Sequence, residues 1–158
     1  MCAERMMETD NKIPFYTFGY GNRVKEEWQQ FVDRIKTDGL YVFDVRMTAR
    51  AWCFMWGGPA LDKSLNDEAQ TRYCHIPEWG NPDKPQLSIA DWDDGLSYFE
   101  IASSEYVWWL SGETSPNAIV LLCCEKDPGT LEEPKCHRML IAKKLIELGY
   151  EYLGELNV

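Results

Sequence analysis

The fold follows from the stretch Ala118-Ile-Val-Leu-Leu-Cys-Cys-Glu-Lys-Asp-Pro128 and from Lys135-Cys-His-Arg138 with the apolar-periodic run 139–148 after it. The continuous apolar run predicts a buried strand, the turn residues that follow end it, and the later apolar spacing predicts a helix. Thiol, carboxylate, imidazole and guanidinium groups meet at this junction. Open α/β sheets bind ligands at such junctions, because strand ends and unpaired helix N–H groups converge there.

Strands and helices alternate along the rest of the chain. The expected strands cover 14–18, 40–46, 71–77, 118–123 and 150–156, and the expected helices cover 24–36, 61–70, 88–110 and 139–148. The segment 40–46 is nearly all apolar, as is typical of a central parallel strand. We therefore expect an α/β fold, a single three-layer Rossmann-like domain with a mainly parallel sheet of about five strands. This domain is expected to span 13–158, after a flexible N-terminal arm at 1–12.

Composition limits the classes of partner. The net charge of −10 makes generic binding to nucleic acid or to anionic membranes unfavourable, because both depend on an excess of Lys and Arg. A local basic pocket remains compatible with this charge. No stretch approaches the ~18 apolar residues of a membrane span. The first dozen residues lack the apolar core of a signal peptide, so we expect a cytoplasmic protein with free cysteines. The cysteines are Cys2, Cys53, Cys74, Cys123, Cys124 and Cys136.

Cys136, His137 and Arg138 fall in the predicted first turn of the last helix. Cations are disfavoured at this end of the helix dipole unless an anion lies among them. A bound phosphate or carboxylate would satisfy the guanidinium and the N–H groups together. In the alternative, Arg138 forms a structural ion pair with Asp44 or Glu125.

Asp44 and Arg46 end the predicted central strand. There the carboxylate can act as a base or hold a ribose hydroxyl, and the guanidinium can bind an anion. A salt bridge of Arg46 with Asp44 is the alternative. Tyr20, Asn22 and Arg50 would complete a polar ring around the same site.

Three tryptophans lie in predicted loops near the strand ends: Trp52, Trp56 and Trp79. Each offers a rigid π face that can stack on a nucleobase, and Trp52 and Trp79 are our candidate ligand contacts. The alternative is a hydrophobic cap over the sheet.

Cys136 is also a candidate nucleophile, since a helix N-terminus and neighbouring cations stabilise a thiolate. Its alternative is a small buried side chain. Zinc could draw on Cys123, Cys136 and His137, but structural zinc sites usually show short paired spacings, and an adjacent Cys-His pair is not expected to bind one ion. We therefore predict no metal.

The sequence has no dinucleotide fingerprint and no Walker lysine, so no NAD or ATP cofactor is predicted.

Several of these motifs together resemble the domain-of-unknown-function family 488. They are Thr17-Phe-Gly-Tyr-Gly-Asn22, Asp44-Val-Arg46, His75-Ile-Pro-Glu-Trp-Gly80, Cys123-Cys-Glu-Lys-Asp-Pro128 and Cys136-His-Arg138. The resemblance covers about 16–156 and implies the fold and the site, but no settled activity. Two departures stand out. Tyr20 and Gly21 replace the family's usual Gly-His-Ser or Gly-His-Thr ending, and the loop after Asp-Val-Arg is tryptophan-rich and retains only Arg50.

The preferred function is a small enzyme acting on a nucleotide, a nucleoside or another phosphorylated ring compound. Arg46, Arg50 and Arg138 would bind the anion, and Asp44 or Glu125 would act as general acid or base. Burial would raise the pKa of Glu125, and a neighbouring arginine would lower it. The alternatives are a non-catalytic module that binds a small anion or nucleotide, and a thiol- or zinc-dependent protein.

Overall fold

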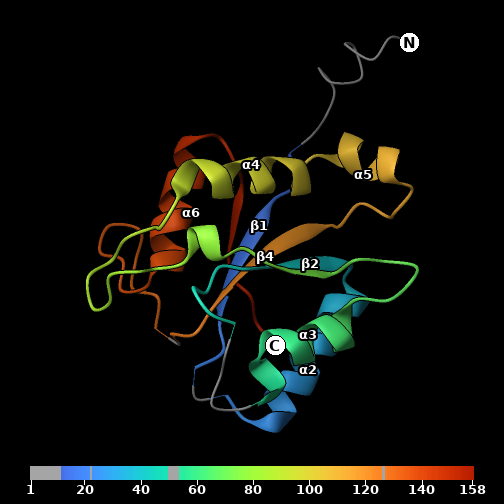
Figure 1. Cartoon of the computed structure of the whole chain (residues 1–158), viewed down its shortest axis with the longest axis horizontal. Coiled ribbons are helices and arrows are strands. Elements are labelled where there is room, and N and C mark those ends of the chain that lie inside the picture. Colours follow the sequence, from blue (N-terminus) through green and yellow to red (C-terminus); the bar gives the residue numbers. More distant parts are fainter. Residues whose placement is uncertain (1–11, 22, 50–53, 126) are drawn as a thin grey trace.

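Five parallel strands form the centre of the molecule in the computed structural model, which describes residues 12–21, 23–49, 54–125 and 127–158. Their spatial order is β3-β2-β4-β1-β5 (Figure 1). The strands are β1 (Phe15–Gly19), β2 (Leu40–Asp44), β3 (Tyr73–His75), β4 (Ala118–Cys123) and β5 (Tyr152–Glu155). Every strand pair within this described part is parallel, so the predicted α/β fold with a parallel sheet is confirmed.

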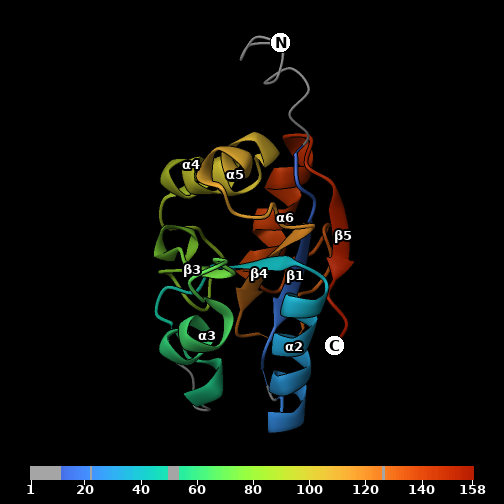
Figure 2. The same ribbon diagram turned by 90° about the vertical axis from the view of Figure 1, so that its right-hand side faces the viewer.

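Helices cover both faces of the sheet and make three layers. One face carries α2 (Lys25–Thr37) and α3 (Gly58–Leu65), and the other carries α4 (Trp92–Ala102), α5 (Glu105–Ser111) and α6 (His137–Glu147) (Figure 2). Two short 3₁₀ turns lie at Phe54–Trp56 and Pro77–Trp79. Each layer of helices closes its own apolar core against the sheet. Among the described residues, none of the helices is long and apolar enough to cross a membrane.

The central strand β4 is the one that the sequence marks most strongly. All six of its residues are buried, and β1 and β2 pair with its two edges. A strand that is covered on both faces and both edges needs apolar side chains throughout, which explains the unbroken run. The helix after it begins at His137, and Cys136, which was expected in the first turn, is its N-cap residue.

The strand order creates a crevice at the carboxyl ends of β1 and β4. The chain leaves β1 toward β2 by way of α2, and it leaves β4 toward β5 by way of α6 on the opposite face. Neighbouring strands whose connections diverge in this way define a topological switch point, where open α/β sheets bind ligands. Gly19 lets the strands close here: an added Cβ would collide with the Glu125 carbonyl oxygen.

Several element boundaries differ from the prediction. The helix predicted at 61–70 is α3, which begins at Gly58 with a proline in its first turn, a position where the missing N–H costs nothing. The strand predicted at 71–77 is only three residues long. One or two helices entered at Ser88 are expected over 88–110; two are present, the first begins at Trp92, and Ser104 caps the second through its side chain. Of the predicted arm, residues 1–11 lie outside the described residues.

Candidate functional site

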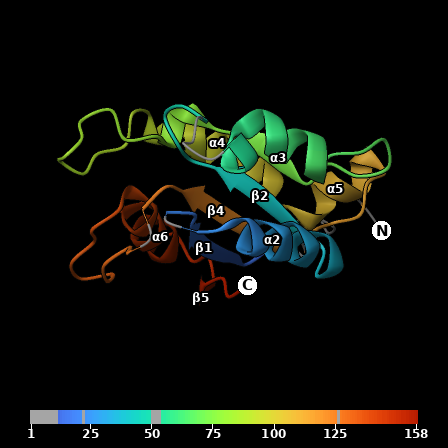
Figure 3. The same cartoon turned by 90° about the horizontal axis from the view of Figure 1, so that it is seen from below.

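Two adjoining cavities lie over the carboxyl ends of the strands. The smaller has a volume of about 240 Å³ and the larger about 410 Å³, and both are lined by Asn81, Lys84 and His137. The segments that follow β3 and β4 extend at the same end of the molecule (Figure 3). The smaller cavity is further lined by Tyr20, Arg46, Met47, Thr48 and Cys124. The larger is further lined by Pro85, Leu87, Glu125, Lys135 and Cys136.

Asp44 and Arg46 form a fully buried ion pair beneath the smaller cavity. Arg46 Nη2 and Nε donate to the two carboxylate oxygens of Asp44 at 2.6 and 2.8 Å, and Arg46 Nη1 donates to the Trp56 carbonyl. Tyr73 donates its hydroxyl to the same carboxylate, and burial followed by the neighbouring Asp44 raises the pKa of Tyr73. Of the two alternatives for this pair, the salt bridge is the one formed. The carboxylate of Asp44 is saturated and 0% exposed, which leaves it no oxygen for the predicted role as a base.

Arg138 lies below the cavities instead of facing them. Its side chain is 0% exposed, Nη2 donates to Glu155 at 2.6 Å, and Nη1 donates to Cys123 Sγ at 2.9 Å and to the Glu125 carbonyl. Burial acts to lower the pKa of Arg138, but the bond to Glu155 and the nearby Cys123, Cys136 and Glu155 together outweigh burial and raise the pKa. Arg138 is therefore a permanent buried cation. The structural alternative, a buried ion pair, is the one formed. The carboxylate partner of Arg138 is Glu155 of the edge strand, whereas Asp44 or Glu125 was expected.

His137 is buried and oriented by the backbone. Its Nε2 lies 2.7 Å from the Val45 carbonyl oxygen, which can only accept, so Nε2 carries the proton. The opposite nitrogen, Nδ1, lies 3.8 Å from Cys136 Sγ. The imidazole thus faces the Cys136 sulfur with Nδ1 and borders both cavities.

Cys123, Cys136 and Glu125 converge with His137 at the end of β4. The two sulfurs are 2.7 Å apart, and Glu125 Oε2 lies 3.7 Å from Cys123 Sγ and 3.4 Å from Cys136 Sγ. The bond from Cys123, with smaller help from His137 and Arg138, lowers the pKa of Cys136 to about 5 against the effect of burial. Burial and the neighbouring Cys136 raise the pKa of Cys123. One proton shared between two sulfurs accounts for these opposite shifts.

Glu125 is the partly exposed member of this group. Burial acts to raise its pKa, but hydrogen bonds from Cys124 and Lys84 outweigh burial and lower the pKa to about 2. Lys84 Nζ lies 2.8 Å from Glu125 Oε1, and Cys124 Sγ lies 2.9 Å from Oε2. Glu125 is therefore an ionised carboxylate at neutral pH, which suits a ligand of a cation and, of the two predicted roles, excludes the general acid.

The predicted aromatic contacts divide. Tyr20 lines the smaller cavity, stacks on Trp56 at 5.7 Å between ring centroids, and has the Arg46 guanidinium 5.2 Å from its own centroid. Trp79 is 0% exposed and stacks on Trp92, so it has no free face for a ligand. Trp56 is buried as well, and for both rings the hydrophobic alternative holds. The remaining candidates, Asn22, Arg50 and Trp52, lie outside the described residues.

Sequence reasoning missed Lys84 and Asn81. Both follow β3, whose carboxyl end reaches the same edge of the sheet as those of β1, β2 and β4. The signal was the cluster of turn residues Asn81-Pro-Asp-Lys-Pro85 directly after a predicted strand. Its significance depends on where that strand lies in the sheet.

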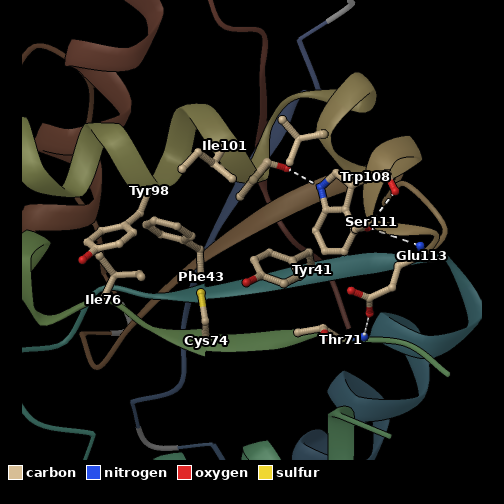
Figure 4. Close-up of a pocket in the computed structure, with 12 residues that line it drawn as sticks. Tyr41, Phe43, Thr71, Cys74, Ile76, Tyr98, Ile101, Trp108, Ser111 and Glu113 are labelled. Atoms are coloured by element: carbon tan, nitrogen blue, oxygen red, sulfur yellow. Dashed lines mark hydrogen bonds between the residues drawn. The ribbon is translucent and has the colours of Figure 1, made fainter. Parts of the chain in front are cut away.

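An apolar cavity of about 360 Å³ lies elsewhere, between the β2–β3 edge and helices α4 and α5 (Figure 4). Phe43, Ile76, Ile101 and Trp108 are among its lining residues. Cys74 and Tyr41 also line it, and burial raises the pKa of Cys74 to about 12 and the pKa of Tyr41 above its usual range. This cavity is apolar, and burial holds its thiol and its phenol neutral.

Comparisons with family models, with curated proteins and with solved structures give no match to this chain. The resemblance to the domain-of-unknown-function family 488 therefore rests on its motifs and stays a prediction.

Proposed function

We propose that this protein is a small enzyme that acts on a small anionic compound, with nucleotides, nucleosides and other phosphorylated ring compounds as the substrate class. The observation that carries the proposal is the lining of the smaller cavity. Its described lining residues include two cations, Arg46 and Lys84, and no carboxylate, in a chain whose net charge is −10. Cationic side chains at an opening favour a negatively charged ligand, which competes with Glu125 for Lys84.

The two cations have different parts in this proposal. Arg46 is neutralised by Asp44 behind it, so it orients Tyr20 and leaves binding of the anion to Lys84. The side chain of Lys84 is 54% exposed and pairs with a partly exposed Glu125, and ion pairs of this kind contribute only about 0–1 kcal/mol. A phosphate group can therefore replace Glu125 as the partner of Lys84 with little loss of free energy. Tyr20 supplies an aromatic surface for the ring of the ligand.

Reactive groups line the adjoining cavity. Glu125, Cys136 and His137 supply a carboxylate, a thiol and an imidazole within reach of a compound that is held at Lys84. Asp44 is not available as a general base, because Arg46 and Tyr73 engage its oxygens. A ligand that takes Lys84 from Glu125 also removes a cause of the low pKa of Glu125, so we assign general base catalysis to Glu125 in the bound state.

The test is a ligand screen with a matched pair of variants. Inorganic phosphate, sugar phosphates, nucleosides and nucleotides are added to the purified protein, and melting temperatures are followed, because a ligand of the folded state must raise them. Lys84→Met is expected to weaken the best ligand by roughly tenfold in calorimetry, the loss of one charge-assisted contact. Lys63→Met makes the same change on the exposed side of α3 and should leave the affinity unaltered.

The proposal would be overturned if no compound of the panel raised the melting temperature. It would also be overturned if Lys84→Met and Lys63→Met changed the ligand affinity equally. The alternative of a non-catalytic binding module is separated by Glu125→Gln. If the protein is an enzyme, this variant loses turnover of the identified ligand and keeps the affinity within a few-fold. A wild-type protein that binds the ligand and never converts it is the binding module.

A further inference from the structure

Four side chains of the site form a cluster suited to a metal ion. One ligand atom from each of Cys123, Glu125, Cys136 and His137 lies within 4.8 Å of all the others, and three of the four residues are buried. Two thiols, an imidazole and a carboxylate are the donors that zinc takes in proteins. The larger cavity borders three members of the cluster, which provides an entry path for an ion.

Three of the ligand-to-ligand distances match the edges of a tetrahedral zinc site, and the distance between the two sulfurs does not. Zinc bonds of about 2.3 Å to sulfur and about 2.0–2.1 Å to nitrogen or oxygen require ligand-to-ligand edges of roughly 3.3–3.8 Å. Cys136 Sγ lies 3.8 Å from His137 Nδ1, and Glu125 Oε2 lies 3.4 and 3.7 Å from the two sulfurs. The sulfurs themselves are 2.7 Å apart, so an ion between them must separate them by about 1 Å.

The surroundings of the cluster orient its ligands. His137 donates Nε2–H to the Val45 carbonyl, which leaves Nδ1 as the ligand atom, and metal-binding histidines are almost always fixed by such a second hydrogen bond. Arg138 donates to Cys123 Sγ and is itself held by Glu155. Two thiolates and one carboxylate carry three negative charges, and a divalent ion together with Arg138 balances them.

The adjacent Cys-His pair, which argued against a metal in the sequence, is explained by its place at a helix start. Cys136 has an extended backbone (φ −133°, ψ 147°), and His137 is the first helical residue. The change of backbone direction between them turns both side chains toward the end of β4.

We propose that Cys123, Glu125, Cys136 and His137 bind one zinc ion at the carboxyl end of β4. Glu125 is the most exposed of the four and the one that faces both the cavity and Lys84, so it is the ligand that a substrate or water can replace. The site goes beyond the proposed function, because metal binding is measured without a substrate. A disulfide between Cys123 and Cys136 would use the same sulfurs and is the competing outcome.

The experiment uses the full chain purified without chelator. Elemental analysis is expected to give one zinc per chain, and replacement by cobalt is expected to give a thiolate-to-metal charge-transfer band. Cys136→Ser should abolish stoichiometric binding, and Cys74→Ser, which changes a thiol of the separate apolar cavity, should leave the stoichiometry and the band unchanged. Glu125→Gln should keep the band and weaken zinc affinity by at least tenfold.

Circular dichroism of each variant separates loss of the metal from loss of the fold. Glu125 is partly exposed, so Glu125→Gln retains a readout if Cys136→Ser does not fold. Absence of zinc and of the cobalt band from folded protein, or a Cys123–Cys136 disulfide found by alkylation and mass spectrometry, would overturn the zinc site. Anion binding at Lys84 is scored separately, so either proposal can fail while the other holds.

Discussion

The polar cavities at the strand ends and the apolar cavity beside α4 and α5 have similar volumes and opposite chemistry. In the apolar cavity, burial raises the pKa of Cys74 to about 12, so its thiol stays neutral. In the larger polar cavity, burial acts on Glu125 in the same direction, but bonds from Cys124 and Lys84 lower its pKa to about 2. Burial by itself favours the neutral form of a titratable group. A buried group stays charged only where hydrogen-bond donors or opposite charges lie beside it.

The difference follows from position along the strands. The apolar cavity lies beside the interiors of β2 and β3, where the backbone groups of one strand pair with those of the other and the side chains pack in the core. The polar cavities lie where the strands end and loops from four of them meet the start of α6. Cavity volume therefore does not distinguish the two regions, whereas convergent polar groups single out the strand ends as the candidate site.

The largest expected effect concerns the buried ion pair under the polar cavity. Asp44→Ala should lower the free energy of unfolding by about 3–5 kcal/mol, because it leaves the Arg46 guanidinium buried without its partner. Urea denaturation measures this loss. Lys135→Met breaks a pair whose two side chains are exposed and should change stability by less than about 1 kcal/mol. Equal losses of stability in the two variants would mean that the buried Arg46 guanidinium does not depend on Asp44, and would contradict the comparison of the two cavities.

A second contrast places the same substitution beside each cavity. Gly19→Ala should destabilise the fold by about 3 kcal/mol, because the new methyl group collides with the Glu125 backbone between β1 and β4. Gly112→Ala lies between two residues that line the apolar cavity and meets open space, so only its positive φ of 80° opposes the change, at about 1 kcal/mol. Thermal unfolding of both variants checks the order. A reversed order would show that β1 and β4 are less tightly closed than described.

The smallest expected effect tests the neutral thiol of the apolar cavity. The pKa of Cys74 is about 12 in the folded protein and its ordinary value is 9.0, so between these values the folded state keeps a proton that the unfolded state has lost. Stability must then fall as pH rises. From pH 8 to pH 10 the wild-type protein should lose about 1.4 kcal/mol more than Cys74→Ala. Parallel urea profiles at the two pH values would contradict a buried neutral thiol.

The sequence predicted the central elements well. The apolar run that became β4 and the periodic segment that became α6 were placed to within a few residues, because a fully buried strand and a packed helix must be apolar in those patterns. It was weaker for β3, which is short and lies at the sheet edge, where one missing neighbour relaxes the demand for apolar side chains.

For the site, the sequence found the residues and not their partners. Cys136, His137 and Glu125 meet at the junction where they were predicted. Asp44 and Arg46, which were expected to face a ligand, instead face each other. The type of a residue and its place at the end of a strand can be predicted from neighbouring residues. The partner of a charged side chain depends on which distant segment of the chain packs beside it.

The parallel α/β fold and the sheet edge where the polar groups gather can be read from the sequence alone, because hydrophobic periodicity and chain breaks are local features. The pairing of Arg138 with Glu155, the contact of Lys84 with Glu125 and the convergence of two thiols, an imidazole and a carboxylate are visible only in the assembled fold. These contacts join residues far apart in the chain. The strand order that brings them together results from packing the whole sheet between its two layers of helices.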